Sequence, residues 1–88
     1  MAVLKRHVAP GMTQEAYDQA SGHVQQSQKE ADGFVAHYAV FENGGLTVTE
    51  VWDSVEQHDA WWDAHMRGVV PADLPRPEFA EIHRINSK

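Results

Sequence analysis

The chain has 88 residues, enough for one small domain and too few for a second hydrophobic core. It has no cysteine, which excludes disulfides, thiolate metal sites and a cysteine nucleophile. Its formal net charge of −6 repels phosphate backbones and anionic lipids, so we expect neither nucleic acid nor a membrane as a partner. We expect a cytoplasmic protein, because no signal peptide is recognisable and no stretch reaches the ~18 apolar residues of a membrane span.

The first half of the chain predicts a strand, a helix and a β-hairpin. Residues 2–8 have strand character. Thr13 is placed to cap a helix that runs to about residue 31 with a thin apolar face that includes Tyr17. Residues 34–41 and 46–52 predict two further strands. Asn43-Gly44-Gly45 between them favours a tight hairpin, because asparagine and glycine accept positive φ values.

The second half adds a helix and a last strand. Asp53 or Ser54 caps a helix expected to run to about residue 69, and the prolines at positions 71, 75 and 77 indicate a loop. Residues 79–85 predict a strand. The order β-α-β-β-α-β is the ferredoxin-like arrangement, an α+β fold with a four-stranded antiparallel sheet and both helices on one face. We expect residues 1–88 to form this single domain.

The bare face of such a sheet needs a cover. Apolar side chains of the second strand would alternate, with Phe34, Ala36, Tyr38 and Val40 on one face and Val35, Ala39 and Phe41 on the other. A second copy of the sheet would bury the uncovered face, so we predict a homodimer that closes into an α+β barrel. The alternative is a monomer with one mildly apolar face exposed.

The second helix carries an unusually aromatic face. On a helical wheel, an arc of about 140° holds Val55, His58, Trp61, Trp62, His65, Met66 and Val69. Such a face would roof a small-molecule pocket between helix and sheet. We predict as substrate-binding residues Trp52, Trp61, Trp62, His65, His7 and Lys5. The alternative is that the two tryptophans of the helix are core and that its histidines lie at the rim.

The histidines do not have the spacing of a metal site. His58 and His65 are seven residues apart, about 10 Å along a helix, which is too far to share one ion. No HExxH motif occurs, so we predict no metal. The alternative is that His7, His37 or His83 converges with His65 from different strands.

Three segments of the chain resemble a known group of proteins. Residues 10–18 read PGMTQEAYD, residues 33–37 read GFVAH, and residues 50–54 read EVWDS. Together with the closing segment around His83, they resemble small proteins of the dimeric α+β barrel superfamily, which are antibiotic biosynthesis monooxygenase-like. The resemblance covers nearly the whole chain and implies this fold and a homodimer. Its activities range over cofactor-free monooxygenases, haem degraders, polyketide cyclases and isomerases, so the fold does not fix the reaction.

His37 and His83 are the predicted catalytic residues. Each falls within a predicted strand, where an unpaired imidazole is costly, and each matches the pattern of the group. A neutral imidazole could accept a proton from a phenol, an enol or an activated C–H. Glu50 could orient one of them, or could pair with Lys5 or Arg6 across the sheet. The alternative is that both histidines are structural and donate to carbonyls at the dimer seam.

Haem chemistry is tested by three positions. The haem-degrading branch has an Asn on the first strand, a Trp on the second helix and a His further along the chain. Alignment on Trp52-Asp53-Ser54 places these at Lys5, at Trp61 and near residues 70–71, so only the Trp is present. We therefore predict no cofactor, with His65, one helical turn past Trp61, as the alternative ligand.

These observations favour a cofactor-independent monooxygenase-like enzyme that acts on a small aromatic or polyketide-like molecule. His37 or His83 would be the proton acceptor. One alternative is a non-catalytic homodimer that binds a small molecule, haem included. Others are an isomerase or cyclase of the same fold, and a housekeeping dimer whose interior is filled by its Trp and His side chains.

Overall fold

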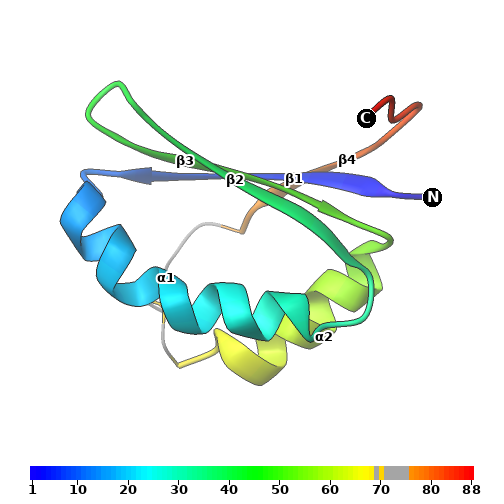
Figure 1. Ribbon diagram of the computed structural model, residues 1–88, viewed down its shortest axis with the longest axis horizontal. Coiled ribbons are helices and arrows are strands. Elements are labelled where there is room, and N and C mark those ends of the chain that lie inside the picture. The colour runs from blue at the N-terminus through cyan, green and yellow to red at the C-terminus, as the bar shows by residue number, and fades with distance from the viewer. Residues whose placement is uncertain (69, 71–75) are drawn as a thin grey trace.

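The computed structural model describes residues 1–68, 70 and 76–88, and in this part of the chain the elements follow the predicted order (Figure 1). They are β1 (Val3–Pro10), α1 (Gln14–Lys29), β2 (Phe34–Glu42), β3 (Gly45–Trp52), α2 (Val55–His65) and β4 (Glu78–Glu81). The prediction of a β-α-β-β-α-β chain is confirmed.

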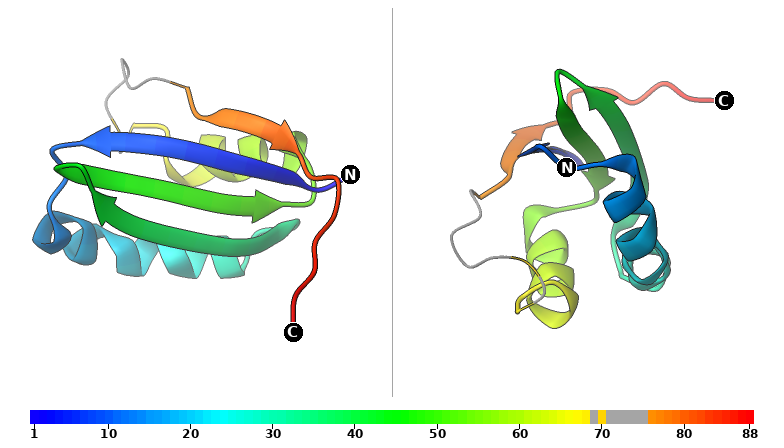
Figure 2. Two further views of the ribbon diagram at one scale, coloured as in Figure 1. Left: turned by 90° about the horizontal axis from the view of Figure 1, so that it is seen from above. Right: turned by 90° about the vertical axis from the view of Figure 1, so that its left-hand side faces the viewer.

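The strands form one antiparallel sheet in the order β2-β3-β1-β4. Both helices lie against the same face of this sheet, and the opposite face has no helix over it (Figure 2). This is the ferredoxin-like α+β arrangement expected from the sequence. Neither α1 nor α2 has the length and apolar composition that a membrane-spanning helix requires.

Side-chain caps fix where the helices begin. The Thr13 hydroxyl accepts a hydrogen bond from the Ala16 N–H at 3.1 Å, and Ser54 accepts one from the Gln57 N–H at 3.2 Å. Thr13 is therefore the predicted cap, and Ser54 is the cap of the second helix. The prediction that this helix reaches residue 69 was wrong: α2 ends at His65, and Gly68 has a φ of 88°, which an α-helix cannot contain.

The hairpin and the last strand follow from local geometry. Asn43 and Gly44 both have positive φ values, 52° and 74°, so the predicted hairpin turn is confirmed. The strand predicted over residues 79–85 is shorter, because β4 runs antiparallel past the start of β1. Glu81 pairs with Val3, and the Ile82 N–H donates to the Ala2 carbonyl at 2.9 Å. Beyond that point β1 offers no partner for a longer strand. The prolines at positions 71 and 75, which were predicted to lie in a loop, are outside the described residues.

A β-bulge corrects the predicted alternation of β2. Phe34 pairs with Trp52 and Ala36 with Val51, so that Val35 is an extra residue in the strand. Phe34 therefore lies on the helix-covered face together with His37, instead of on the face of Tyr38. The bulge reverses the phase of the side chains along the rest of the strand.

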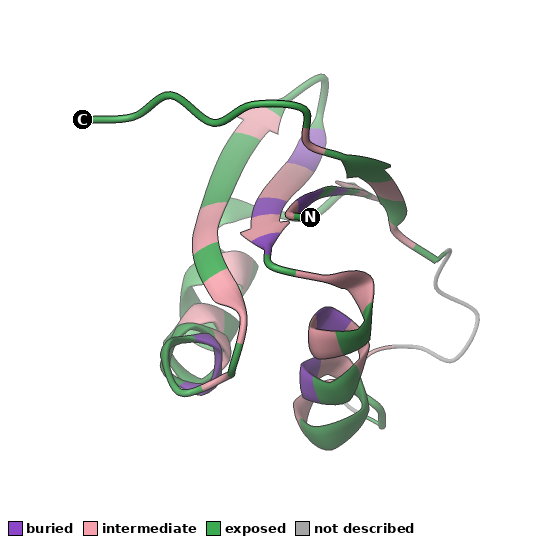
Figure 3. Cartoon of the chain, turned by 90° about the vertical axis from the view of Figure 1, so that its right-hand side faces the viewer, coloured by how far each residue is buried: buried purple, intermediate pink, exposed green. Residues whose placement is uncertain are grey.

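The core is small and unusually polar. Its apolar centre is Val3, Trp52 and Trp61, against which partly buried side chains from both helices, β2 and β4 pack. The buried positions lie on β1, β3 and the inner sides of the helices (Figure 3). Five polar residues are also buried: Lys5, Ser27, Gln28, Glu50 and His58. Charged side chains are almost never buried without a partner, so these residues indicate an internal polar network.

Two glycines should respond oppositely to alanine. A Cβ on Gly33 would lie 2.5 Å from the side-chain amide of Gln57, and the φ of Gly33 is +87°. We expect Gly33→Ala to lower the free energy of unfolding by about 1–2 kcal/mol. Gly22, inside α1, has open space around it, so Gly22→Ala should raise that free energy by about 0.5–1 kcal/mol. Urea unfolding of both variants measures this, and changes of the same sign would contradict it.

Candidate functional site

Glu50 lies at the centre of a buried hydrogen-bond network. Only 2% of its surface is exposed, and four side chains from three strands and a helix converge on its carboxylate. Oε1 accepts from Trp52 Nε1 at 3.0 Å and lies 3.3 Å from Lys5 Nζ. Oε2 accepts from Gln28 Nε2 at 2.6 Å and from His37 Nδ1 at 2.7 Å. The carboxylate thus has charged or polar partners at both oxygens.

The sheet register brings these residues together. Glu50 on β3 pairs with Lys5 on β1 and with His37 on β2, so the three side chains form a row on the helix-covered face. The two roles considered for Glu50, orienting a histidine and pairing with Lys5, are therefore fulfilled together. Arg6 pairs with Thr49 and is exposed. Because the Lys5–Glu50 pair is buried, its loss would cost far more than that of a surface salt bridge.

The charge state of Glu50 decides which nitrogen of the His37 ring carries a hydrogen. Burial alone would raise the pKa of the Glu50 carboxyl, but the His37 hydrogen bond, the Lys5 charge and the other donors outweigh it and lower this pKa to about 2. Burial also lowers the pKa of the Lys5 ammonium, against the attraction of Glu50. An ionised carboxylate only accepts hydrogen bonds, so His37 Nδ1 carries a hydrogen. In the neutral tautomer that carries this hydrogen, Nε2 is the acceptor.

Tyr17 occupies that acceptor. Its hydroxyl lies 2.8 Å from His37 Nε2, and burial raises the pKa of the phenol, so it stays protonated and donates. The Tyr17 ring also packs edge-on against Phe41, with centroids 5.9 Å apart. Glu50, His37 and Tyr17 thus form a continuous carboxylate–imidazole–phenol chain. Tyr17 was expected only as part of the apolar face of the first helix, so its contact with His37 is a finding of the structure.

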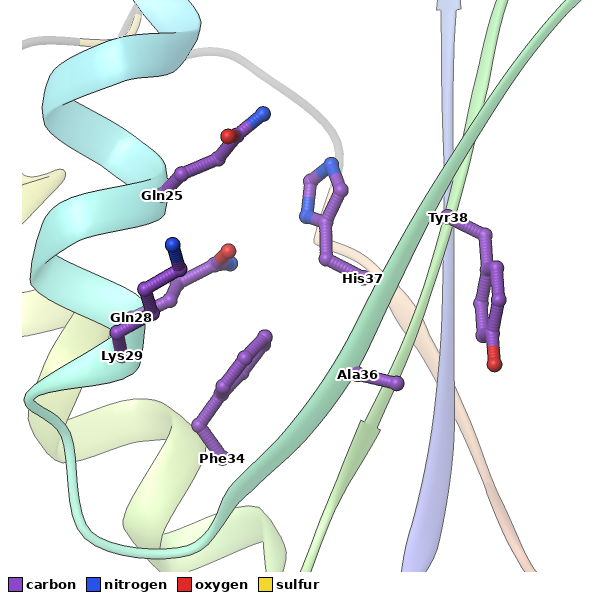
Figure 4. A pocket seen from close by; sticks show the side chains of 7 residues that line it. All are labelled: Gln25, Gln28, Lys29, Phe34, Ala36, His37 and Tyr38. Atoms are coloured by element: carbon purple, nitrogen blue, oxygen red, sulfur yellow. The ribbon is translucent and has the colours of Figure 1, made fainter. Parts of the chain in front are cut away.

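A pocket of about 300 Å³ opens beside His37, between α1 and β2. It is lined by Gln25, Gln28, Lys29, Phe34, Ala36, His37 and Tyr38. The side chains of Gln25, Gln28, Phe34 and His37 reach into the space between helix and strand, and Tyr38 points away across the sheet (Figure 4). The volume is at the lower end of the ~300–1,000 Å³ range of small-molecule sites. Of the predicted site residues, only His37 lines this pocket.

The space under α2, where we expected the pocket, is filled by aromatic rings. The His58 ring lies within 6 Å, centroid to centroid, of four of them, from Trp52, Trp61, Trp62 and Phe79. Trp52 and Trp61 are 0% and 4% exposed, and Trp61 Nε1 donates to Ser27 Oγ at 2.9 Å. Trp61 thus lies in the core, as the alternative for the helix tryptophans expected, whereas Trp62 is only partly buried. His58, at 2% exposed, lies inside the cluster instead of at its rim.

The other predicted substrate-binding residues surround this aromatic cluster only in part. Lys5 Nζ lies 4.7 Å from the centre of the Trp62 ring, and His7 lies 6.2 Å from it. His65 is apart from them and packs beside His23 of α1, with centroids at 6.2 Å. The predicted catalytic His83 is exposed and follows the end of β4, instead of lying within a strand. No contact in the described part of the chain joins it to His37.

Comparison with solved structures confirms the fold. Neither a protein-family profile nor a curated protein matches the sequence. A haem-degrading protein from Mycobacterium tuberculosis aligns with a TM-score of 0.70 and 18% identity over 99% of this chain and 100% of its own. SnoaB, a cofactor-independent oxygenase from Streptomyces nogalater, aligns with a TM-score of 0.53 and 12% identity over 98% of this chain and 92% of its own. A Chloroflexus aurantiacus protein assigned as an antibiotic biosynthesis monooxygenase aligns with a TM-score of 0.57 and 18% identity over 98% of this chain and 95% of its own.

These likenesses define the class of fold. The chain has the antibiotic biosynthesis monooxygenase-like α+β fold that its sequence motifs resembled. At 12–18% identity they establish the fold and leave the reaction open.

In the part of the chain that the structure describes, the pocket beside His37 offers no free axial ligand for haem. His37 has both ring nitrogens engaged, by Glu50 and by Tyr17. His7 and His58 have buried Nε2 atoms without a partner in the described residues, but the described pocket lies beside α1 and touches neither. Across residues 1–68, 70 and 76–88, no group of three His, Asp or Glu side chains could hold a metal ion. We derive no step through either group.

The Glu50 network should make stability depend on acid pH. A carboxyl whose pKa falls from 4.5 to about 2 on folding stabilises the fold above pH 4.5, and this contribution disappears as the pH falls towards 2. We expect a loss of roughly 3 kcal/mol in the free energy of unfolding across that window. Urea unfolding at stepped pH values measures it.

Two variants separate this effect from the titration of other carboxyls. Lys5→Met/Glu50→Gln removes both buried charges together and should flatten the slope, whereas Glu30→Gln at the exposed end of α1 should leave it unchanged. Equal slopes for the wild type and the double variant would contradict the assignment.

Proposed function

We propose that this chain is a cofactor-independent monooxygenase-like enzyme that removes a proton from a small aromatic molecule bound beside His37. The observation that carries the proposal is the Glu50–His37–Tyr17 chain at the wall of the pocket. It presents an imidazole whose tautomer is set by a buried carboxylate, next to a space of ligand size.

His37 has the geometry of a general base. Its Nε2 lone pair already accepts from a phenol at 2.8 Å, the distance a substrate hydroxyl would need. When a substrate group replaces the Tyr17 hydroxyl, its proton moves to Nε2. The resulting imidazolium is stabilised by Glu50, which remains ionised because its pKa is about 2. His37 is therefore the proposed catalytic residue, and Glu50 positions it.

Molecular oxygen would complete the reaction as a co-substrate. Loss of a proton from a methylene activated by aromatic rings leaves a carbanion, which can transfer electrons to oxygen directly. The balanced conversion is CH2 + O2 to C=O + H2O, in which the carbon is oxidised by four electrons and both oxygen atoms are reduced. The shared fold with a protein described as a cofactor-independent oxygenase supports this reaction class.

One observation favours a non-catalytic binder instead. The Tyr17 hydroxyl already caps His37 Nε2, so the imidazole is satisfied without substrate. In that case the pocket would hold a small molecule and His37 would be structural. An isomerase or cyclase would share the first proton transfer and consume no oxygen.

We further propose that the chain forms a homodimer through the bare face of its sheet. Four large apolar side chains on that face are 38–59% exposed: Leu4, Val8, Tyr38 and Val40. They come from β1 and β2 on either side of β3, whose bare-face residues between them are Thr47, Thr49 and Val51, so the face is mixed with a large apolar share. A second copy offers the same surface in self-complementary form and adds core that a domain of this size needs.

Oxygen uptake tests the base. With an activated anthrone-like or hydroquinone-like substrate, His37→Gln should reduce the rate by about 100-fold or more, because the proton acceptor is lost. His83→Gln, at the exposed residue beyond β4, should leave the rate within about twofold. Unchanged uptake in His37→Gln would rule out His37 as the base, whereas ligand binding without any oxygen uptake by the wild type would make the protein a binder.

Sedimentation tests the dimer. At micromolar concentration, sedimentation equilibrium of the wild type should give a molecular mass of about twice that of the 9.9 kDa chain. Val8 and Val40 both pair with Thr47, from opposite sides of β3, so Val8→Lys/Val40→Lys places two charges on the bare face of the sheet. This variant should be monomeric. Gln19→Lys/Ala20→Lys adds the same charge on the exposed side of α1 and should leave the dimer intact. A monomeric wild type would contradict the proposal.

A further inference from the structure

Gln28 has an unusual environment for a glutamine in a surface helix. It is 0% exposed, it lies in α1 one turn after Val24, and it forms part of the floor of the pocket beside His37. Its amide has one partner: Nε2 donates to Glu50 Oε2 at 2.6 Å. The other amide atom, Oε1, is buried and has no partner in the described part of the chain.

The charge of Glu50 decides which way this amide points. Only the NH2 group can donate to an ionised carboxylate, and the Glu50 pKa of about 2 keeps the carboxylate ionised. A flipped amide would place two acceptors 2.6 Å apart. The group left over is therefore a carbonyl oxygen, which requires a hydrogen-bond donor. A buried acceptor without a donor is costly.

The pocket next to Gln28 presents a second acceptor. His37 Nε2 becomes available as an acceptor once a ligand group replaces the Tyr17 hydroxyl. The Gln28 and His37 side chains reach into the same space from facing elements (Figure 4). The floor of the site therefore suits a ligand that supplies hydrogens, and it leaves an ether without a partner. A carboxylate is a different case, because Lys29 also lines the pocket.

We propose that Gln28 is a specificity-determining residue whose amide oxygen selects hydroxylated aromatic molecules over their ethers and ketones. The inference rests on the proposed function, because it assigns the ligand class of the same pocket. His7 and His58 also have unpartnered buried nitrogens, but no described pocket adjoins them. Gln28 is the residue at which an unsatisfied buried atom and a cavity coincide.

Matched naphthalenes test this directly. 2-Naphthol, 2-methoxynaphthalene and 2-naphthoic acid share one ring system and differ in the group that meets Gln28. We expect the wild type to bind the naphthol roughly tenfold more tightly than the ether, because of these two only the naphthol supplies a donor. The acid serves as a control for the charge of Lys29, which also lines the pocket. Quenching of tryptophan fluorescence or calorimetry measures the three affinities.

Methionine variants of two residues that line the pocket complete the experiment. Gln28→Met should reduce the preference for naphthol over the ether to about twofold, whatever its effect on overall affinity. Gln25→Met, at an exposed residue of the same pocket, should retain the wild-type preference. If Gln28→Met does not fold, the wild type still decides the question, because the Gln28 carbonyl ¹³C resonance should shift with naphthol and not with the ether.

The outcomes separate the two proposals. Equal affinities for naphthol and ether in the wild type, or a preference that survives in Gln28→Met, would overturn the role of Gln28 and leave the pocket and His37 standing. Binding of none of the three compounds, together with absent oxygen uptake, would overturn the proposed function as well.

Discussion

The structure depends on one buried negative charge. An isolated carboxylate inside a protein is strongly unfavourable, so the fold must supply donors to both oxygens of Glu50. They come from β1, β2, β3 and α1, that is, from every element next to it except α2. Helix α1 must therefore sit at the height that places Gln28 against Glu50, and the strands must pair in the register that aligns Lys5, Glu50 and His37. The charge specifies the arrangement more strictly than the small apolar core could.

The same charge links stability to the proposed chemistry. Glu50 orients the His37 ring so that Nε2 accepts from Tyr17, and it turns the Gln28 amide so that its oxygen has no donor in the described part of the chain. Lys5 balances the charge from the opposite side and lies over the Trp61 and Trp62 rings, which joins the polar network to the aromatic cluster under α2. The two halves of the interior are thus coupled through one ion pair, although only the α1 half has the described pocket.

The sequence predicted elements better than it predicted the site. Thr13, Ser54 and Asn43-Gly44 give strong local signals, so the helix starts and the hairpin were found, whereas the ends of α2 and β4 depend on Gly68 and on the position of β1. His37 and a role for Glu50 were identified from strand patterns. Gln28 and Tyr17 were missed, because their partners lie across the fold; the one available signal was that both share a helical face with Val24 and Ala31. The Trp-rich face of α2 indicated burial correctly, but large rings fill a space as readily as they line one.

The bulge at Val35 determines which side chains of β2 reach the interior. Because it adds one residue opposite Trp52 and Val51, every later residue of the strand is displaced by one position relative to strict alternation. Without it, keeping Phe34 paired with Trp52 would place Ala36 opposite Glu50, turn Tyr38 to the helix-covered face and send His37 to the bare face of the sheet. A single unpaired residue near the start of β2 therefore decides that the His37 imidazole faces the interior. An insertion or deletion of one residue within 33–36 would exchange the two faces of the strand while hardly altering its composition.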